Sequence, residues 1–94
     1  MNKEEAKIIL ESKLAEYRAM TYLELVSFID TEPHTSEITS KNDNWYQIEI
    51  QFFWDDKLNN DIRVIGSIDD GGKSVYKPLT SSFIMSPVGA FVGE

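Results

Sequence analysis

Hydrophobic residues recur at helical spacing through the first part of the chain. Asn2, followed three residues later by Glu5, has the pattern of a capping box, which favours the start of a helix. The apolar positions that follow fall on one side of a helix that turns by about 100° per residue. These positions are Ala6, Ile9, Leu10, Leu14, Tyr17 and Met20. The pattern therefore predicts an amphipathic first helix.

A second capping box, Thr21 with Glu24, opens another segment with helical spacing. Its apolar positions are Tyr22, Leu25, Val26 and Ile29. In one straight helix the two apolar stripes would point roughly 130° apart, so we expect a bend between Ala19 and Thr21. The segment is also rich in β-branched and aromatic residues, which leaves a strand over 22–29 as an alternative.

After Pro33 the pattern changes to the alternation of β-strands. The clearest strand runs from Trp45 to Phe53, and its inward set is Tyr46, Ile48, Ile50 and Phe52. A weaker strand precedes it at 34–40, and a third alternates from Ile62 to Ile68. A fourth strand is expected to begin near Ser74, with Pro78 at an edge or a bulge, and a small hairpin is expected over 83–92.

These elements predict one α+β domain over residues 1–94, with helices in 1–30 and an antiparallel sheet in 34–94. We expect an N-terminal helix, or a kinked helical pair, on one face of a four-stranded antiparallel meander, which makes two layers. The inward sides of the strands should meet the helices in one core. This order of elements is similar in outline to cystatin-like folds. The similarity carries no residue motif and implies nothing about activity.

The composition limits the kinds of partner and the cellular compartment that we expect for this protein. The chain has 94 residues, no cysteine and a formal net charge of −7. The absence of cysteine favours a reducing compartment, and the apolar run Ile8–Leu10 is far too short for a signal peptide or a membrane span. We therefore expect a cytoplasmic protein that does not bind membranes. The negative charge repels nucleic-acid phosphates and favours a basic protein partner.

No residue pattern indicates a catalytic, cofactor or metal site. His34 is the sole histidine and is interpreted as a loop residue. The acidic pairs Asp55-Asp56 and Asp69-Asp70 flank the third strand, whose length would hold them about 20 Å apart. Only Asp43 could join the second pair, and neither spacing matches a calcium loop. These carboxylates are therefore interpreted as turn residues.

The sheet face turned away from the helices combines large apolar side chains with polar ones. Its candidate interaction residues are Trp45, Gln47, Glu49, Gln51, Phe53, Arg63 and Ile65. Apolar anchors among adaptable polar groups are typical of an interface with a partner or with a second copy of the chain. We expect a non-enzymatic interaction domain, such as an adaptor, an inhibitor or an immunity-type protein. The alternative is a carboxylate-based enzyme or a ligand-binding protein with a pocket between helices and sheet.

Overall fold

The computed structural model describes residues 1–72 and 77–94, and it contains two helices and one sheet. Helix α1 spans Lys3–Arg18, and the Asn2 side chain caps it by accepting a hydrogen bond from the Glu5 amide at 3.1 Å. Helix α2 spans Tyr22–Val26 and begins with the complete capping box of Thr21 and Glu24. The predicted break between two helices is confirmed, and the strand alternative for 22–29 is wrong.

Four strands follow in a single antiparallel sheet with the order β1-β2-β3-β4. They are β1 (His34–Thr39), β2 (Trp45–Trp54), β3 (Ile62–Asp69) and β4 (Leu79–Met85). Each strand pairs with its neighbour in the sequence, as a meander requires. The strands β1 and β4 lie at the two edges. The predicted α+β class with a helical layer on an antiparallel meander is therefore confirmed.

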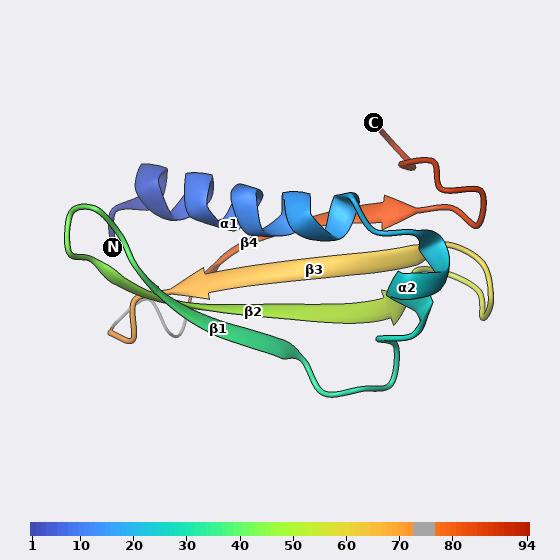
Figure 1. The fold of residues 1–94 in the computed structure, drawn as a ribbon, viewed down its shortest axis with the longest axis horizontal. Coiled ribbons are helices and arrows are strands. Elements are labelled where there is room, and N and C mark those ends of the chain that lie inside the picture. The colour runs from blue at the N-terminus through green and yellow to red at the C-terminus, as the bar shows by residue number, and fades with distance from the viewer. Residues whose placement is uncertain (73–76) are drawn as a thin grey trace.

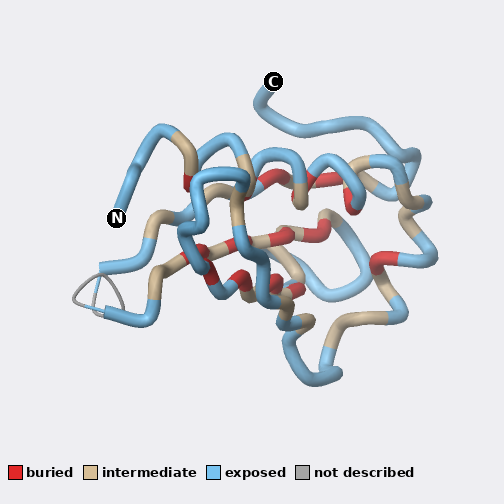
Figure 2. Tube along the Cα trace, turned by 60° about the vertical axis from the view of Figure 1, so that its left-hand side comes forward, coloured by how far each residue is buried: buried red, intermediate tan, exposed pale blue. Residues whose placement is uncertain are grey.

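Helix α1 lies along one face of the sheet and packs against β3 and β4, while α2 packs against the beginning of β3 (Figure 1). The core forms between these layers, where the buried segments of helix and strands face one another (Figure 2). Leu10 and Leu14 supply the helix side, and Ile48, Ile50 and Val64 supply part of the sheet side. The core positions chosen from the apolar alternation are confirmed.

The last strand differs from its sequence-based prediction. Its predicted start near Ser74 lies outside the described residues, and the described strand begins at Leu79, directly after Pro78. Phe83 to Met85 belong to this strand, so they form the fourth strand of the sheet as well as the first arm of the small hairpin. The second arm pairs through Phe91 with Met85, and Val92 donates a hydrogen bond to Ile84.

No helix in the described part of the chain combines the length and the apolar character that crossing a membrane requires.

Candidate functional site

The predicted interaction residues all lie on the outer face of the sheet, which is the face opposite α1. They belong to β2 and β3, which are the two central and directly paired strands. Along both strands buried positions alternate with more exposed ones, because successive side chains point to opposite faces. The fold therefore places the predicted residues on one continuous surface.

The strand register brings large apolar side chains together at one end of this surface. Phe53 pairs with Arg63, which pairs in turn with Ile84 of β4. In the next row Gln51 pairs with Ile65, so Ile65 is the diagonal neighbour of both Phe53 and Ile84. Such diagonal side chains are within reach of one another in an antiparallel sheet. We call Phe53, Ile65 and Ile84 the apolar patch.

Phe53 is 45% exposed, while Ile65 and Ile84 are partly buried. Ile84 was not among the predicted residues because sequence reasoning placed 83–85 in a terminal hairpin and not in the sheet. Because the residues on both sides of Ile84 are also apolar, no alternation in the sequence marks it as an outward residue. With Ile84 included, the patch extends across three strands.

Arg63 lies inside this patch but is already paired. Its Nε and Nη2 atoms both donate to Oδ1 of Asp55, at 2.8 and 2.7 Å. Asp55 belongs to the connection that follows β2, so the ion pair fixes the arginine side chain beside its own strand. Because Asp55 neutralises the guanidinium, Arg63 presents mainly the methylene groups of its side chain on this surface and adds little free positive charge.

Trp45 lies at the other end of β2 and does not join the apolar patch. A Cβ atom built on Gly71 would meet the Trp45 ring at 2.7 Å, so the indole packs directly on the backbone of this glycine. Gly71 has a φ of 77°, a left-handed conformation that glycine adopts without steric cost. Trp45 therefore has a contact within its own chain that accounts for its position.

The remainder of the outer face is polar and acidic. Glu37, Glu49 and Asp69 project from β1, β2 and β3 at paired or neighbouring register positions around Gln47. Glu37 is exposed, and the other two carboxylates are partly exposed. The outer face thus consists of an apolar end and an acidic end.

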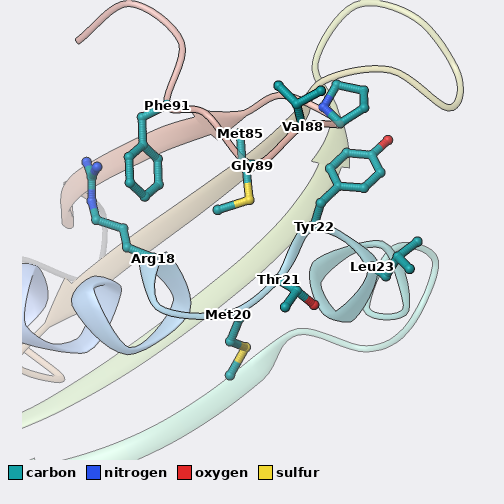
Figure 3. Close-up of a pocket in the computed structure, with 10 residues that line it drawn as sticks. Arg18, Met20, Thr21, Tyr22, Leu23, Met85, Val88, Gly89 and Phe91 are labelled. Atoms are coloured by element: carbon teal, nitrogen blue, oxygen red, sulfur yellow. The ribbon is translucent and has the colours of Figure 1, made fainter.

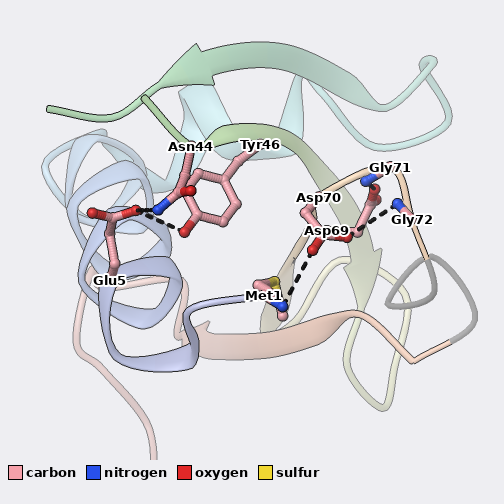
Figure 4. Close-up of polar contacts among 8 residues, drawn as sticks. All are labelled: Met1, Glu5, Asn44, Tyr46, Asp69, Asp70, Gly71 and Gly72. Atoms are coloured by element: carbon pink, nitrogen blue, oxygen red, sulfur yellow. Dashed lines mark hydrogen bonds and ion pairs between the residues drawn. The ribbon is translucent and has the colours of Figure 1, made fainter. Parts of the chain in front are cut away.

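The acidic turn after β3 has the structural role that its sequence indicated. Oδ1 of Asp69 accepts a hydrogen bond from the Gly71 amide at 2.8 Å, and Oδ1 of Asp70 accepts one from the Gly72 amide at 3.0 Å. Oδ2 of Asp70 also lies 3.3 Å from the amino nitrogen of Met1 (Figure 4). Both carboxylates bind backbone or amino groups of this chain, as residues of a tight turn commonly do.

A second polar cluster joins α1 to the turn between β1 and β2. The Glu5 carboxylate accepts hydrogen bonds from the Tyr46 hydroxyl at 2.7 Å and from Asn44 Nδ2 at 3.0 Å (Figure 4). It also accepts one from Asn42 Nδ2 at 2.7 Å. The hydrogen bonds from Asn44 and Tyr46 are the main reasons that the pKa of Glu5 falls from 4.5 to about 2. Burial, together with the hydrogen bond to Glu5, raises the pKa of Tyr46 to about 12. The cluster therefore holds a carboxylate and a neutral phenol, and it fixes the helix to the sheet.

His34 is part of the sheet, as the strand predicted over 34–40 implied, and its interpretation as a loop residue is wrong. It is the first residue of β1 and lies partly buried on the helix side, where its Nδ1 atom is 2.9 Å from the Tyr17 hydroxyl. The rings of Phe28 and Phe52 pack on it with centroid distances of 4.5 and 4.9 Å. Burial raises the pKa of Tyr17. The imidazole thus ties the end of α1 to the sheet edge.

The space between α1 and the centre of the sheet is filled by packed side chains. A Cβ atom on Gly66 would approach Leu10 Cδ1 to 2.9 Å, Ile50 Cδ1 to 3.1 Å and Leu14 Cδ2 to 3.2 Å. The fourteen residues that form the buried core are all hydrophobic, and no polar or charged residue among those described is buried with them. Around Gly66, α1 and β3 are therefore in direct contact.

Comparisons with protein-family models, with curated proteins and with solved structures find no significant match to this chain.

Proposed function

We propose that this protein is a small interaction domain, of the adaptor, inhibitor or immunity type, that binds a protein partner through the outer face of its sheet. The single observation that carries the proposal is the apolar patch of Phe53, Ile65 and Ile84. It lies on the sheet face that no helix covers, whereas α1 and α2 pack on the opposite face. A central group of apolar side chains with a polar rim is the usual composition of a protein interface.

The charge of the molecule favours a basic partner. The formal net charge is −7, and Glu37, Glu49 and Asp69 share the outer face with the patch while Asp55 neutralises Arg63. Two copies meeting through this face would bring like charges together, which disfavours self-association. A basic protein would instead be attracted to the acidic end and contact the apolar end.

The same charge argues against nucleic acid as the ligand. The cysteine-free composition supports a reducing compartment, so we expect the partner among cytoplasmic proteins.

The proposal is tested by affinity capture from a lysate of the source cell with wild-type protein, Ile65→Glu and Gln47→Glu. Both variants add one negative charge to the outer face, but only the first lies in the apolar patch. We expect one basic protein to be retained by wild type and by Gln47→Glu and lost with Ile65→Glu. Raising the salt from about 50 mM to about 500 mM should weaken its capture, because salt screens the electrostatic attraction.

Equal capture by both variants would show that the apolar patch is not the binding surface. Capture that does not weaken as the salt concentration rises would contradict the proposed electrostatic attraction between this protein and its partner.

A further inference from the structure

A second surface, beside the C-terminal end of β4, has the composition of a small-molecule site. A hollow of about 680 Å³ lies between the junction of the two helices and the hairpin that follows β4. Met20 and Tyr22 line it from the helical side, and Met85, Val88 and Phe91 line it from the C-terminal side (Figure 3). Its volume falls within the range of about 300–1,000 Å³ that is usual for ligand pockets.

Several apolar side chains that line this hollow are exposed to solvent. Leu23 is 76% exposed and Val88 is 90% exposed, although both are aliphatic residues. Phe91 is also exposed, and Met20 is only partly buried. A methionine side chain at a surface adapts readily to the shape of an apolar ligand, and an aromatic ring offers it a flat apolar surface. The walls therefore suit a hydrocarbon or an aromatic body.

One cationic side chain borders the hollow. Arg18 ends α1, and in Figure 3 it lies with Phe91 at one end of the hollow while Tyr22 and Leu23 lie at the other. Its guanidinium carbon stands 4.8 Å from the centroid of the Phe83 ring and 4.9 Å from that of Phe91. Two aromatic contacts hold the cation in place, as cation–π interactions do.

This guanidinium already binds a carboxylate. Nη1 of Arg18 donates to both oxygens of the Glu94 side chain, at 2.8 and 2.9 Å. The Glu94 side chain is 46% exposed, and an ion pair in such a position contributes little to stability. A carboxylate from outside the chain can therefore replace it at small cost.

We propose that this hollow binds a small monocarboxylic acid with an apolar body, and that its carboxylate takes the position of Glu94 on Arg18. The apolar body would lie against Met20, Met85 and Phe91. Glu94 then acts as an internal competitor that lowers the affinity for the ligand. This site is independent of the outer sheet face and of the function proposed above.

The test uses octanoate as the probe, with octan-1-ol as its uncharged counterpart. The chain contains three methionines, so labelling of their ε-methyl groups gives three NMR signals. We expect octanoate to shift the signals of Met20 and Met85 saturably and to leave that of Met1 unchanged, because Met1 does not line the hollow. Octan-1-ol should bind about two- to fivefold more weakly, since it lacks the charge-assisted hydrogen bonds.

Two variants test the contact between Arg18 and the carboxylate of the ligand, and a third variant serves as the control. Arg18→Gln should weaken octanoate binding by about two- to fivefold, whereas Glu94→Gln should strengthen it by up to about fivefold. Lys13→Gln removes a positive charge from the same helix away from the hollow and should leave the affinity unchanged. The Glu94→Gln and octan-1-ol results do not depend on how well Arg18→Gln folds.

The proposal is overturned if Met20 and Met85 show no saturable shift with octanoate up to about 10 mM in wild type and in Glu94→Gln. It is equally overturned if folded Arg18→Gln retains the wild-type affinity, or if octan-1-ol binds as tightly as octanoate.

Discussion

Glu5 connects three parts of the molecule through a single carboxylate. It belongs to the first turn of α1, and it accepts hydrogen bonds from Asn42 and Asn44 of the β1–β2 turn and from Tyr46 of β2. These donors favour the ionised form, so the pKa falls from 4.5 to about 2 on folding. Glu5 therefore stabilises the fold fully above pH 4.5, and this contribution is lost as the pH falls towards 2.

We predict that Glu5→Gln is less stable than wild type near neutral pH and that this difference shrinks at about pH 3, where much of the stabilisation by ionised Glu5 has been lost. The measurement is the free energy of unfolding in urea at both pH values. Glu4→Gln is the matched control, because Glu4 is the exposed neighbour in the same turn, and its stability should follow that of wild type. A wild-type and a Glu5→Gln curve that stay parallel over this range would refute the role of the cluster.

The capping box predicted from Asn2 and Glu5 is only half formed, because Asn2 accepts a hydrogen bond from the Glu5 amide while the Glu5 carboxylate accepts its hydrogen bonds from the sheet side. The spacing of Asn2 and Glu5 predicted the start of the helix, because that contact is local. The partners of Glu5 lie about forty positions later in the chain, and only the folded sheet brings them together. His34 was misassigned for the same reason, since Phe28 and Phe52 surround it from separate elements.

At the scale of elements, Gly66 allows α1 to approach β3 closely. The side chains of Leu10, Leu14 and Ile50 occupy the space that a side chain at this position would take. The sequence showed a glycine in a strand that is otherwise rich in branched residues. The structure gives the reason, which is direct contact of the helix with the strand.

We predict that Gly66→Val destabilises the protein by about 1–3 kcal/mol, although valine is the better strand former, because the core has no room for it. Urea unfolding measures the loss. Ser67→Val is the matched control on the outer face of the same strand and should change stability by no more than about 0.5 kcal/mol. A Gly66→Val protein as stable as wild type would mean that the helix does not pack here.

Elements whose hydrophobic residues recur with a clear period could be predicted from the sequence. Elements that depend on pairing between distant parts of the chain were harder to predict. The helical stripe of α1 and the alternation of β2 and β3 follow from local spacing. For β4 the sequence offered Pro78, two serines and a terminal turn, which do not reveal that Ile84 pairs with Arg63. The hollow beside Arg18 was missed because its walls come from two segments, 18–23 and 85–91, that lie far apart in the sequence.

At the scale of the whole molecule, the two faces of the sheet differ in what they contact. The inner face buries the core beneath α1 and α2, and the outer face presents the apolar patch next to its acidic end. With a net charge of −7, copies of the chain repel one another in dilute salt.

We therefore predict that the isolated protein is a monomer at about 100 μM and low ionic strength, where electrostatic repulsion is strongest. Sedimentation equilibrium measures the mass directly, and the expected value is that of one chain, 10.8 kDa. A dimer that dissociates in Ile65→Glu but not in Gln47→Glu would instead show that the outer face binds a second copy of the chain.

The most direct test of the interaction surface combines stability and binding in one variant, Phe53→Glu. Because Phe53 is 45% exposed and points away from the core, its replacement should change the free energy of unfolding by no more than about 0.5 kcal/mol. The same replacement should abolish partner capture, because interfaces depend on a few central apolar residues. A protein that unfolds on this substitution would show that its own chain covers the face, and a stable variant with undiminished capture would show that the partner binds elsewhere.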